Sequence, residues 1–225
     1  DWLKIAIIKI REIKKRKMTP ILVGGTGLYF KALTEGLVEI PMIPVNIRKK
    51  IRTLHQSIGQ KKFYKKLLNL DPMIVNQINS SDSQRSIRAY EVKLFTKKSI
   101  TEWFKSTSSK FEKKEFIKLS IDYPRSELVE KINKRTKQMF DIGVVLEVKR
   151  FLSRRISKNK SISKAIGIAE IEDFIKKKIT KDEVIEKISI KTRQYAKRQA
   201  TWSRGHMTSW KKIRPQRLNH FIKKI

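Results

Sequence analysis

The sequence contains no cysteine, only eight glycines and six prolines, and few acidic residues. The absence of cysteine excludes a disulfide scaffold, a thiolate nucleophile and a zinc site with cysteine ligands, and the three histidines do not have the spacing of metal ligands. No apolar run reaches the length of about 18 residues that a membrane-spanning helix needs, and residues 1–10 are too charged for a signal peptide. We therefore expect no secreted or membrane-embedded protein, and a cytoplasmic location.

Positive charge dominates what is present. Lysine and arginine number 54 against 21 acidic residues, so the formal net charge is +33 over 225 residues. Such a field favours a polyanionic partner, although a composition rich in lysine and isoleucine also spreads lysines over solvated surfaces without a binding role. The apolar fraction of 39 %, with four tryptophans and ten phenylalanines, indicates a folded core. Arginine, glutamine and aromatic residues at specific spacings are therefore more informative than the total charge.

The first part of the chain has the pattern of an α/β fold. A helix is predicted over residues 2–17, and residues 21–23 form a short apolar run that is typical of a buried strand. A glycine-rich turn follows at 24–27, and a second helix is predicted over 28–35. Helix, strand, turn and helix in this order predict a piece of a parallel sheet.

The rest of the chain is mostly helical in pattern. Residues 116–122 alternate like a strand, and Thr180 with Glu183 predicts a capping box for a long helix that ends at Gly205. We predict an α/β core interrupted by a helical insertion domain. The predicted parts are 1–40 (core), 41–113 (helical insertion domain) and 114–225 (core continuation with one strand and the C-terminal helices).

The turn at 24–27 is the first candidate site. A strand that enters such a turn and then a helix presents free backbone N–H groups at the carboxyl edge of a sheet, where open α/β sheets bind ligands. Thr26 adds a hydroxyl group. The turn lacks the Gly-Lys-Ser/Thr ending of a triphosphate-binding loop. The alternative is a tight turn that only needs the backbone freedom of glycine.

The second candidate is the segment Gln-Arg-Ser-Ile-Arg at 84–88, at the start of a helix that either Ser81 or Asp82 can cap. Helical spacing puts its glutamine and both arginines on one broad face. Such side chains can contact phosphates or base edges, and the alternative is a solvated basic face.

Arg135 is the third candidate, because it interrupts an apolar helical stripe of Leu128, Ile132 and Met139. A buried guanidinium without a partner is costly. Either a carboxylate pairs with Arg135, or Arg135 faces a cleft that holds an anion such as a pyrophosphate.

The fourth candidate is the helical segment 192–204, where basic residues alternate with Tyr195, Trp202 and amide side chains. This mixture suits single-stranded RNA, whose bases can stack on aromatic rings. The alternative is a core helix with a solvated back.

Together these motifs resemble the bacterial tRNA dimethylallyltransferases, also called tRNA isopentenyltransferases. The segments that carry the resemblance, in the order of the family, are 20–37, 82–92, the helix around Arg135, 163–168 and 192–204. One position departs from the family pattern, because Ile168 stands where an aromatic residue is usual.

The resemblance implies a P-loop-type α/β core and the transfer of a dimethylallyl group from dimethylallyl diphosphate to N6 of the adenosine 3′ of the anticodon, assisted by Mg²⁺. The implied partners are a tRNA anticodon stem-loop and dimethylallyl diphosphate, with no membrane, and a monomer is expected. By position, Thr26 would lie beside the reacting base, and Arg135 would bind the diphosphate; both would be catalytic-site residues. The implied tRNA-binding residues are Thr26, Arg48, Gln84, Arg85, Ser86, Ile87, Arg88, Lys164, Lys197, Arg198, Gln199, Thr201, Trp202 and Arg204.

The family also has a phosphate loop and an Asp-Ser segment with the general base, and neither is in this sequence. Residue 1 is Asp and already lies in a helical pattern. We therefore expect an N-terminally truncated relative that is inactive alone, since each missing group supplies several kcal/mol of transition-state stabilisation. The alternative is a non-catalytic basic RNA-binding protein. A general binder of anionic surfaces is disfavoured, because no helix has the strong segregation of polar and apolar residues that membrane adsorption needs.

Overall fold

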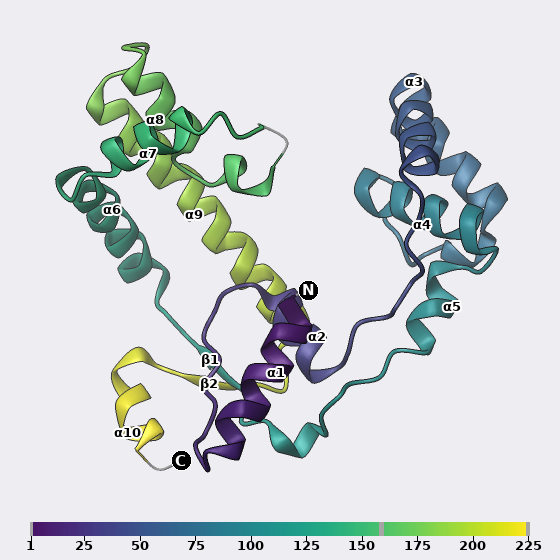
Figure 1. Cartoon of the computed structure of the whole chain (residues 1–225), viewed down its shortest axis with the longest axis horizontal. Helices are drawn as coiled ribbons and strands as arrows, with labels where there is room; N and C mark the ends of the chain where they lie inside the picture. Colours follow the sequence, from purple (N-terminus) through teal and green to yellow (C-terminus); the bar gives the residue numbers. More distant parts are fainter. Residues whose placement is uncertain (1, 158–159, 224–225) are drawn as a thin grey trace. The chain divides into compact units, whose positions relative to one another are not determined.

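The computed structural model describes residues 2–157 and 160–223, which form two compact units (Figure 1). The first unit comprises Asp1–Leu22 and Leu28–Phe116, and the second comprises Val23–Gly27 and Ile117–Ile225. Each unit has a hydrophobic core of its own.

The first unit begins with two short helices, α1 (Trp2–Lys15) and α2 (Gly27–Thr34). The rings of Trp2 and Tyr29 stack between them, 4.3 Å apart and nearly parallel. Lys14 of α1 pairs with Glu115 at 2.7 Å, in the short helix η2 (Lys113–Glu115). Aromatic stacking and this ion pair therefore connect α1 with α2 and with the last residues of the unit.

A helical bundle forms the larger part of the first unit (Figure 1). It comprises α3 (Val45–Leu70), η1 (Pro72–Ile74), α4 (Ser83–Thr96) and α5 (Ile100–Lys105). Gly59, with φ 72°, divides α3 at a kink. Phe63 and Leu67 of α3 are buried; Leu67 packs in one cluster with Ala89 and Val92 of α4, and the Phe63 ring lies against that of Tyr90.

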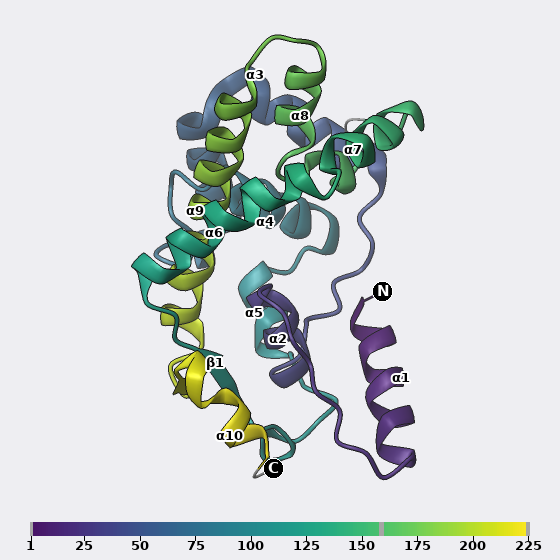
Figure 2. The same cartoon turned by 90° about the vertical axis from the view of Figure 1, so that its left-hand side faces the viewer.

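The second unit contains a two-stranded parallel sheet and a set of helices. Strand β1 (Leu119–Ile121) pairs with β2 (Lys211–Ile213), with Leu119 opposite Lys211. The helices are α6 (Arg125–Asp141), α7 (Val144–Ser153), η3 (Ser161–Lys164), α8 (Ile168–Ile175), α9 (Lys181–His206), η4 (Pro215–Arg217) and α10 (Leu218–Ile222). Figure 2 shows α6 crossing α9, and α8 beside α9.

The core of the second unit lies where α7, α8 and α9 meet. Val148, Ile171, Val184 and Ile188 are at most 6 % exposed there. The capping box of α9 is present, because Thr180 Oγ1 accepts a hydrogen bond from the Glu183 N–H and Glu183 accepts one from the Thr180 N–H. This local signal, read from the sequence, is confirmed.

The predicted fold class is confirmed: the protein is mostly helical, with a small parallel sheet. The predicted strand at residues 21–23 is wrong. These residues form no ladder, and Ile21 and Val23 are 67 % and 92 % exposed. A strand needs a hydrogen-bonded neighbour, and no strand among the described residues pairs with this run.

The described residues between 41 and 113 form helices and turns without a strand. The boundaries 1–40, 41–113 and 114–225 stay a prediction. No described helix combines the length and the apolar character needed to cross a bilayer.

Candidate nucleic-acid interface

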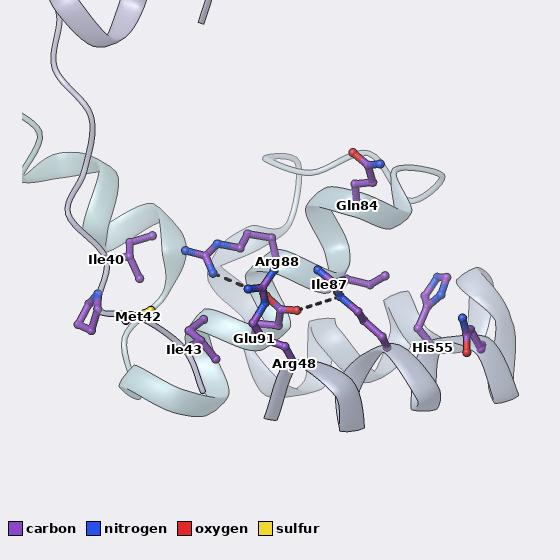
Figure 3. Close-up of a pocket in the computed structure, with 12 residues that line it drawn as sticks. Ile40, Met42, Ile43, Arg48, His55, Gln84, Ile87, Arg88 and Glu91 are labelled. Atoms are coloured by element: carbon purple, nitrogen blue, oxygen red, sulfur yellow. Dashed lines mark ion pairs between the residues drawn. The ribbon is translucent and has the colours of Figure 1, made fainter. Parts of the chain in front are cut away.

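A basic pocket of about 780 Å³ lies in the first unit, between α3, α4 and the loop before α3 (Figure 3). Arg48, Arg52 and His55 face it from α3 at spacings of four and three residues, so they occupy one side of that helix. The whole lining is Ile40, Pro41, Met42, Ile43, Arg48, Arg52, His55, Gln56, Gln84, Ile87, Arg88 and Glu91.

Glu91 is the acidic residue of this pocket, and its side chain is only 3 % exposed. Its carboxylate pairs with Arg48 (Nε–Oε2 3.9 Å), Arg52 (Nε–Oε1 3.7 Å) and Arg88 (Nη1–Oε2 3.6 Å). The arginine side chains remain 43–57 % exposed. Three positive charges against one negative charge leave the pocket electropositive, which suits a phosphate group.

The other residues of the 84–88 segment lie in different surroundings. Asp82, rather than Ser81, caps α4, because its Oδ1 accepts a hydrogen bond from the Arg85 N–H at 3.0 Å. Arg85 is exposed, pairs with Asp82 at 3.3 Å and does not line the pocket. Ser86 is fully buried, and its hydroxyl donates to the Asp82 carbonyl at 2.7 Å. The structure therefore brings Arg85 to the surface and keeps Ser86 inside.

Gln60, just after the kink of α3, fixes the ring of His55. Its Nε2 donates to the Ser80 carbonyl at 2.6 Å, so its Oε1 is the atom that faces His55 Nε2 at 2.9 Å. A carbonyl oxygen only accepts hydrogen bonds, so Nε2 of His55 carries a proton. The same amide donates to Ser86 Oγ at 3.1 Å. A hydrogen-bond network thus connects the pocket with the first turn of α4.

In the second unit, the 24–27 turn packs against α9. Gln199 Nε2 donates to the Gly25 carbonyl at 3.0 Å. A Cβ atom on Gly25 would lie 2.1 Å from that nitrogen, and one on Gly27 would lie 2.0 Å from the Trp202 ring. Neither glycine has a positive φ, so close approach, rather than a tight-turn conformation, explains both. Thr26 between them is exposed.

Only some of the α9 residues that were predicted to bind RNA are exposed to solvent. Lys197, Arg198, Thr201 and Arg204 are exposed, whereas Gln199 and Trp202 are half-buried against the turn. The guanidinium of Arg198 lies over the Tyr195 ring, and that of Arg204 is 3.4 Å from Thr201 Oγ1. Trp202 stacks on His206 with ring centres 4.4 Å apart. The exposed subset is the part of the predicted RNA surface that remains open to solvent.

Arg135 is exposed, and no carboxylate of the described chain pairs with it, so the first of its two alternatives finds no support here. The buried positions of α6 are Ile132 and Thr136, four residues apart, and the Thr136 hydroxyl donates to the Ile132 carbonyl. The helical period continues the buried face through Thr136, so Arg135 turns to solvent. Its role in binding diphosphate stays a prediction.

Lys164, at the end of η3, is exposed, and the neighbouring turn is held by a buried carboxylate. Glu170, 5 % exposed, accepts a hydrogen bond from the Gly167 N–H at 3.0 Å and pairs with Lys191 of α9. Burial raises the pKa of Glu170, but the hydrogen bonds from Lys191 and the backbone lower it more, so the net shift is downward. Glu170 is therefore charged at neutral pH and anchors α8 to α9.

Magnesium was expected from the resemblance. Among residues 2–157 and 160–223, no three histidine, aspartate or glutamate side chains lie together as a metal site requires. These residues do not fit a Mg²⁺ site built from protein ligands alone, and we assign no step to the ion.

Sequence reasoning missed Arg52, His55 and Glu91. Arg52 follows Arg48 by four residues, and Glu91 follows Arg88 by three, so helical spacing alone would have placed each beside a predicted residue. Their convergence on one pocket depends on how α3 packs against α4, which the sequence does not state.

A family model described as IPP transferase matches residues 1–206. The chain belongs to the IPP transferase family. It is 54 % identical over 225 residues to a tRNA dimethylallyltransferase of Pelagibacter ubique, covering all of this chain and 72 % of that protein. A tRNA dimethylallyltransferase of Allorhizobium ampelinum is 37 % identical over 96 % of this chain and 71 % of its own length.

Solved structures of IPP transferases share the fold. A full-length tRNA isopentenylpyrophosphate transferase of Bacillus halodurans matches with a TM-score of 0.58 and 29 % identity, over 95 % of this chain and 66 % of that one. A eukaryotic dimethylallyltransferase described as acting on tRNA matches with a TM-score of 0.71 and 24 % identity, over 90 % and 51 %. The chain thus spans about two thirds of the Bacillus protein and half of the eukaryotic one.

Proposed function

We propose that this IPP transferase takes part in tRNA modification, by transfer of a dimethylallyl group from dimethylallyl diphosphate to N6 of the adenosine 3′ of the anticodon. The product is N6-isopentenyladenosine. The observation that carries the proposal is 54 % identity, over all 225 residues, to a protein named tRNA dimethylallyltransferase. The electropositive pocket of the first unit and the exposed basic side chains of α9 support an RNA substrate.

In this proposal the first unit binds the anticodon stem-loop. Arg48 and Arg88 offer guanidinium groups to backbone phosphates, and Gln84 at the pocket edge offers an amide that suits a base edge. Arg85, outside the pocket, adds a further phosphate contact. Because unpaired RNA bases are splayed and accessible, amide and arginine side chains together suit a loop better than a duplex.

The second unit positions the reacting base in this proposal. Thr26 presents its hydroxyl from a turn that Gln199 and Trp202 hold in place. Lys164, Lys197, Arg198 and Arg204 contact RNA phosphates, and Thr201 lies on the same exposed part of α9. Arg135, exposed and without a carboxylate partner in the described chain, binds the diphosphate.

The phosphate loop, and the Asp-Ser segment that follows it in the family, are not among the 225 residues; the pair Asp82-Ser83 belongs to the segment 82–92 instead. We propose that this polypeptide alone binds RNA and does not transfer the prenyl group. Mg²⁺ bound with the diphosphate, a cytoplasmic location and a monomeric state are further predictions.

The test uses the 225-residue chain with a labelled anticodon stem-loop, and with dimethylallyl diphosphate and Mg²⁺. We expect binding that weakens steeply with salt, as for phosphate contacts, and no labelled product. Transfer by this chain would overturn the inactivity proposal. Failure to bind the stem-loop would count against an RNA substrate. Restoration of transfer by adding the phosphate-loop segment of a relative would distinguish an enzyme from a non-catalytic RNA-binding protein.

A further inference from the structure

Glu91 stands out because it is a buried carboxylate with three arginine neighbours and an oxygen that makes no hydrogen bond. Its Oε1 has no hydrogen-bond partner in the described chain, and its three ion pairs span 3.6–3.9 Å. These distances are longer than those of direct N–H···O hydrogen bonds. The carboxylate therefore acts on the guanidinium groups through its charge and does not occupy their donors.

The three arginines come from two helices. Arg48 and Arg52 extend from α3 and Arg88 from α4, and each pairs with Glu91. Figure 3 shows Arg48 and Arg88 beside Glu91. Each guanidinium has five N–H donors in a planar fork. Because the ion pairs leave these donors free and the side chains half-exposed, each arginine can still donate to a ligand in the pocket.

Charge balance explains why three guanidinium groups can gather here. Without Glu91, the three positively charged guanidinium groups would repel each other and move apart into solvent. With Glu91 the group keeps a net charge of about +2, from three cations and one anion. The arginines are thereby oriented before any ligand binds, which reduces the ordering cost of binding.

We propose that Glu91 is a positioning residue for RNA binding, and that Arg52 is a phosphate-binding residue alongside Arg48 and Arg88. The ligand chemistry is two neighbouring phosphates of a single-stranded RNA backbone. Two phosphates balance the net charge of the group, and helical spacing puts Arg48 and Arg52 about one turn apart on α3. The inference rests on the proposed function, because it assumes that the chain binds the anticodon stem-loop.

Glu91→Gln tests the positioning role by the sign of its effect. The substitution removes one negative charge, so the net charge of the protein rises by one. If Glu91 affected binding through net charge alone, the variant would bind RNA more tightly. Positioning by Glu91 predicts weaker binding, by about tenfold, since oriented charge-assisted contacts are lost. Glu91→Asp keeps the carboxylate and should restore part of the affinity. The measurement is the Kd of the stem-loop by fluorescence anisotropy, with thermal unfolding of each variant recorded beside it.

Arg52→Ala tests the phosphate contact through salt dependence. The slope of log Kd against log salt should fall by about 0.7, the value for one phosphate contact with a single strand. Lys49→Ala is the matched control: Lys49 is an exposed cation on the same helix and does not line the pocket. Its slope should stay close to that of the parent chain.

A double variant separates positioning from a general effect on folding. If Glu91 acts through Arg52, Glu91→Gln should cost less affinity in the Arg52→Ala background than in the parent chain. Full additivity would overturn the positioning role, even if Glu91→Gln also lowered the melting temperature.

Competition by pyrophosphate distinguishes a free diphosphate from RNA as the ligand. RNA binding by the parent chain shows whether the proposed function or only this inference has failed. Inorganic pyrophosphate at millimolar concentration should compete weakly; strong competition that Arg52→Ala abolishes would assign the pocket to a free diphosphate and overturn the RNA assignment. A parent chain that binds no stem-loop would overturn the proposed function together with this inference. A parent chain that binds RNA, with Glu91→Gln binding equally or more tightly, would overturn this inference alone.

Discussion

Gln199 of α9 donates a hydrogen bond to the main-chain oxygen of Gly25, 174 positions earlier in the chain, at 3.0 Å. Trp202, one turn later on α9, packs its ring against Gly27. These two contacts hold the turn that carries Thr26, so residues predicted to bind RNA also shape the turn. A loss of activity on changing Gln199 or Trp202 would therefore combine the loss of an RNA contact with a displacement of the turn.

Gly27→Ala should destabilise the protein by roughly 1–3 kcal/mol, because a Cβ would overlap the rigid Trp202 ring. Gly25→Ala should cost less than about 1 kcal/mol, since it meets the flexible end of Gln199, which can move at the expense of one hydrogen bond. Gly205→Ala in α9 is the control: nothing lies within 4 Å of its Cβ, and it should stabilise by about 0.5–1 kcal/mol. Urea unfolding measures all three. Equal costs for Gly27→Ala and Gly205→Ala would refute the close packing of Trp202.

Asp82→Ala should cost about 1 kcal/mol, because it removes the oxygen that caps α4. Ser81→Ala should have less effect, since Ser81 is exposed and does not cap the helix. Asp82→Asn should retain most of the stability, because asparagine is as good a cap. Thermal unfolding followed by circular dichroism compares the three variants. A larger loss for Ser81→Ala than for Asp82→Ala would contradict the assignment of the cap.

Protonation of Glu170 should make the protein less stable in acid. Its pKa is lower in the folded protein than its ordinary value of 4.5, so its contribution is fully present above that value and is lost as pH falls through the folded pKa. Unfolding free energy should therefore decline as the pH falls below about 4.5, and decline less in Glu170→Gln. Glu170→Gln should itself cost roughly 1–3 kcal/mol at pH 7, because Lys191 and Gly167 lose a charged acceptor.

Glu147→Gln provides the matched control for this titration, since Glu147 is exposed on α7 and forms no ion pair within the described chain. Its pH profile should follow that of the parent protein. Identical acid profiles for Glu170→Gln and the parent would show that Glu170 is not the group responsible.

Arg135→Ala should leave stability within about 0.5 kcal/mol of the parent chain, because the side chain is exposed and unpaired in the described structure. Ile132→Ala, one turn earlier and buried, should cost about 2–5 kcal/mol. Chemical denaturation of both variants is the measurement. A cost above about 2 kcal/mol for Arg135→Ala would contradict the exposed, unpaired position of its side chain.

Local signals in the sequence predicted the elements well. The capping box at Thr180 and Glu183 is a contact between neighbours in the chain, and it is confirmed. The alternation of apolar and polar residues over 116–122 predicted β1, because it too is a local pattern in the sequence. The buried face of α6 continues from Ile132 to Thr136, one residue after Arg135, and the sequence pattern does not resolve a difference of one residue.

Features that depend on distant partners were not predictable. Strand β2 has one buried apolar residue, Ile213, after two lysines, so only its pairing with β1 makes it a strand. The run at 21–23 is more strand-like in composition and has no such partner among the described residues. Glu91 has its place through the packing of α3 on α4. In each case the deciding contact joins segments far apart in sequence.

The pairing of β1 with β2 also sets an order for folding during synthesis. β1 is made first and stays without its neighbour until residues 211–213 have left the ribosome, about five to twenty seconds later at ordinary rates of elongation. The helices α6 to α9 can form in that interval, because all of their residues precede β2 in the chain. The turn with Thr26 waits longer still, since Gln199 and Trp202 come more than 170 positions after it. The segment proposed to meet the reacting base is thus among the first to be made, and it is held in place only after most of the chain has been made.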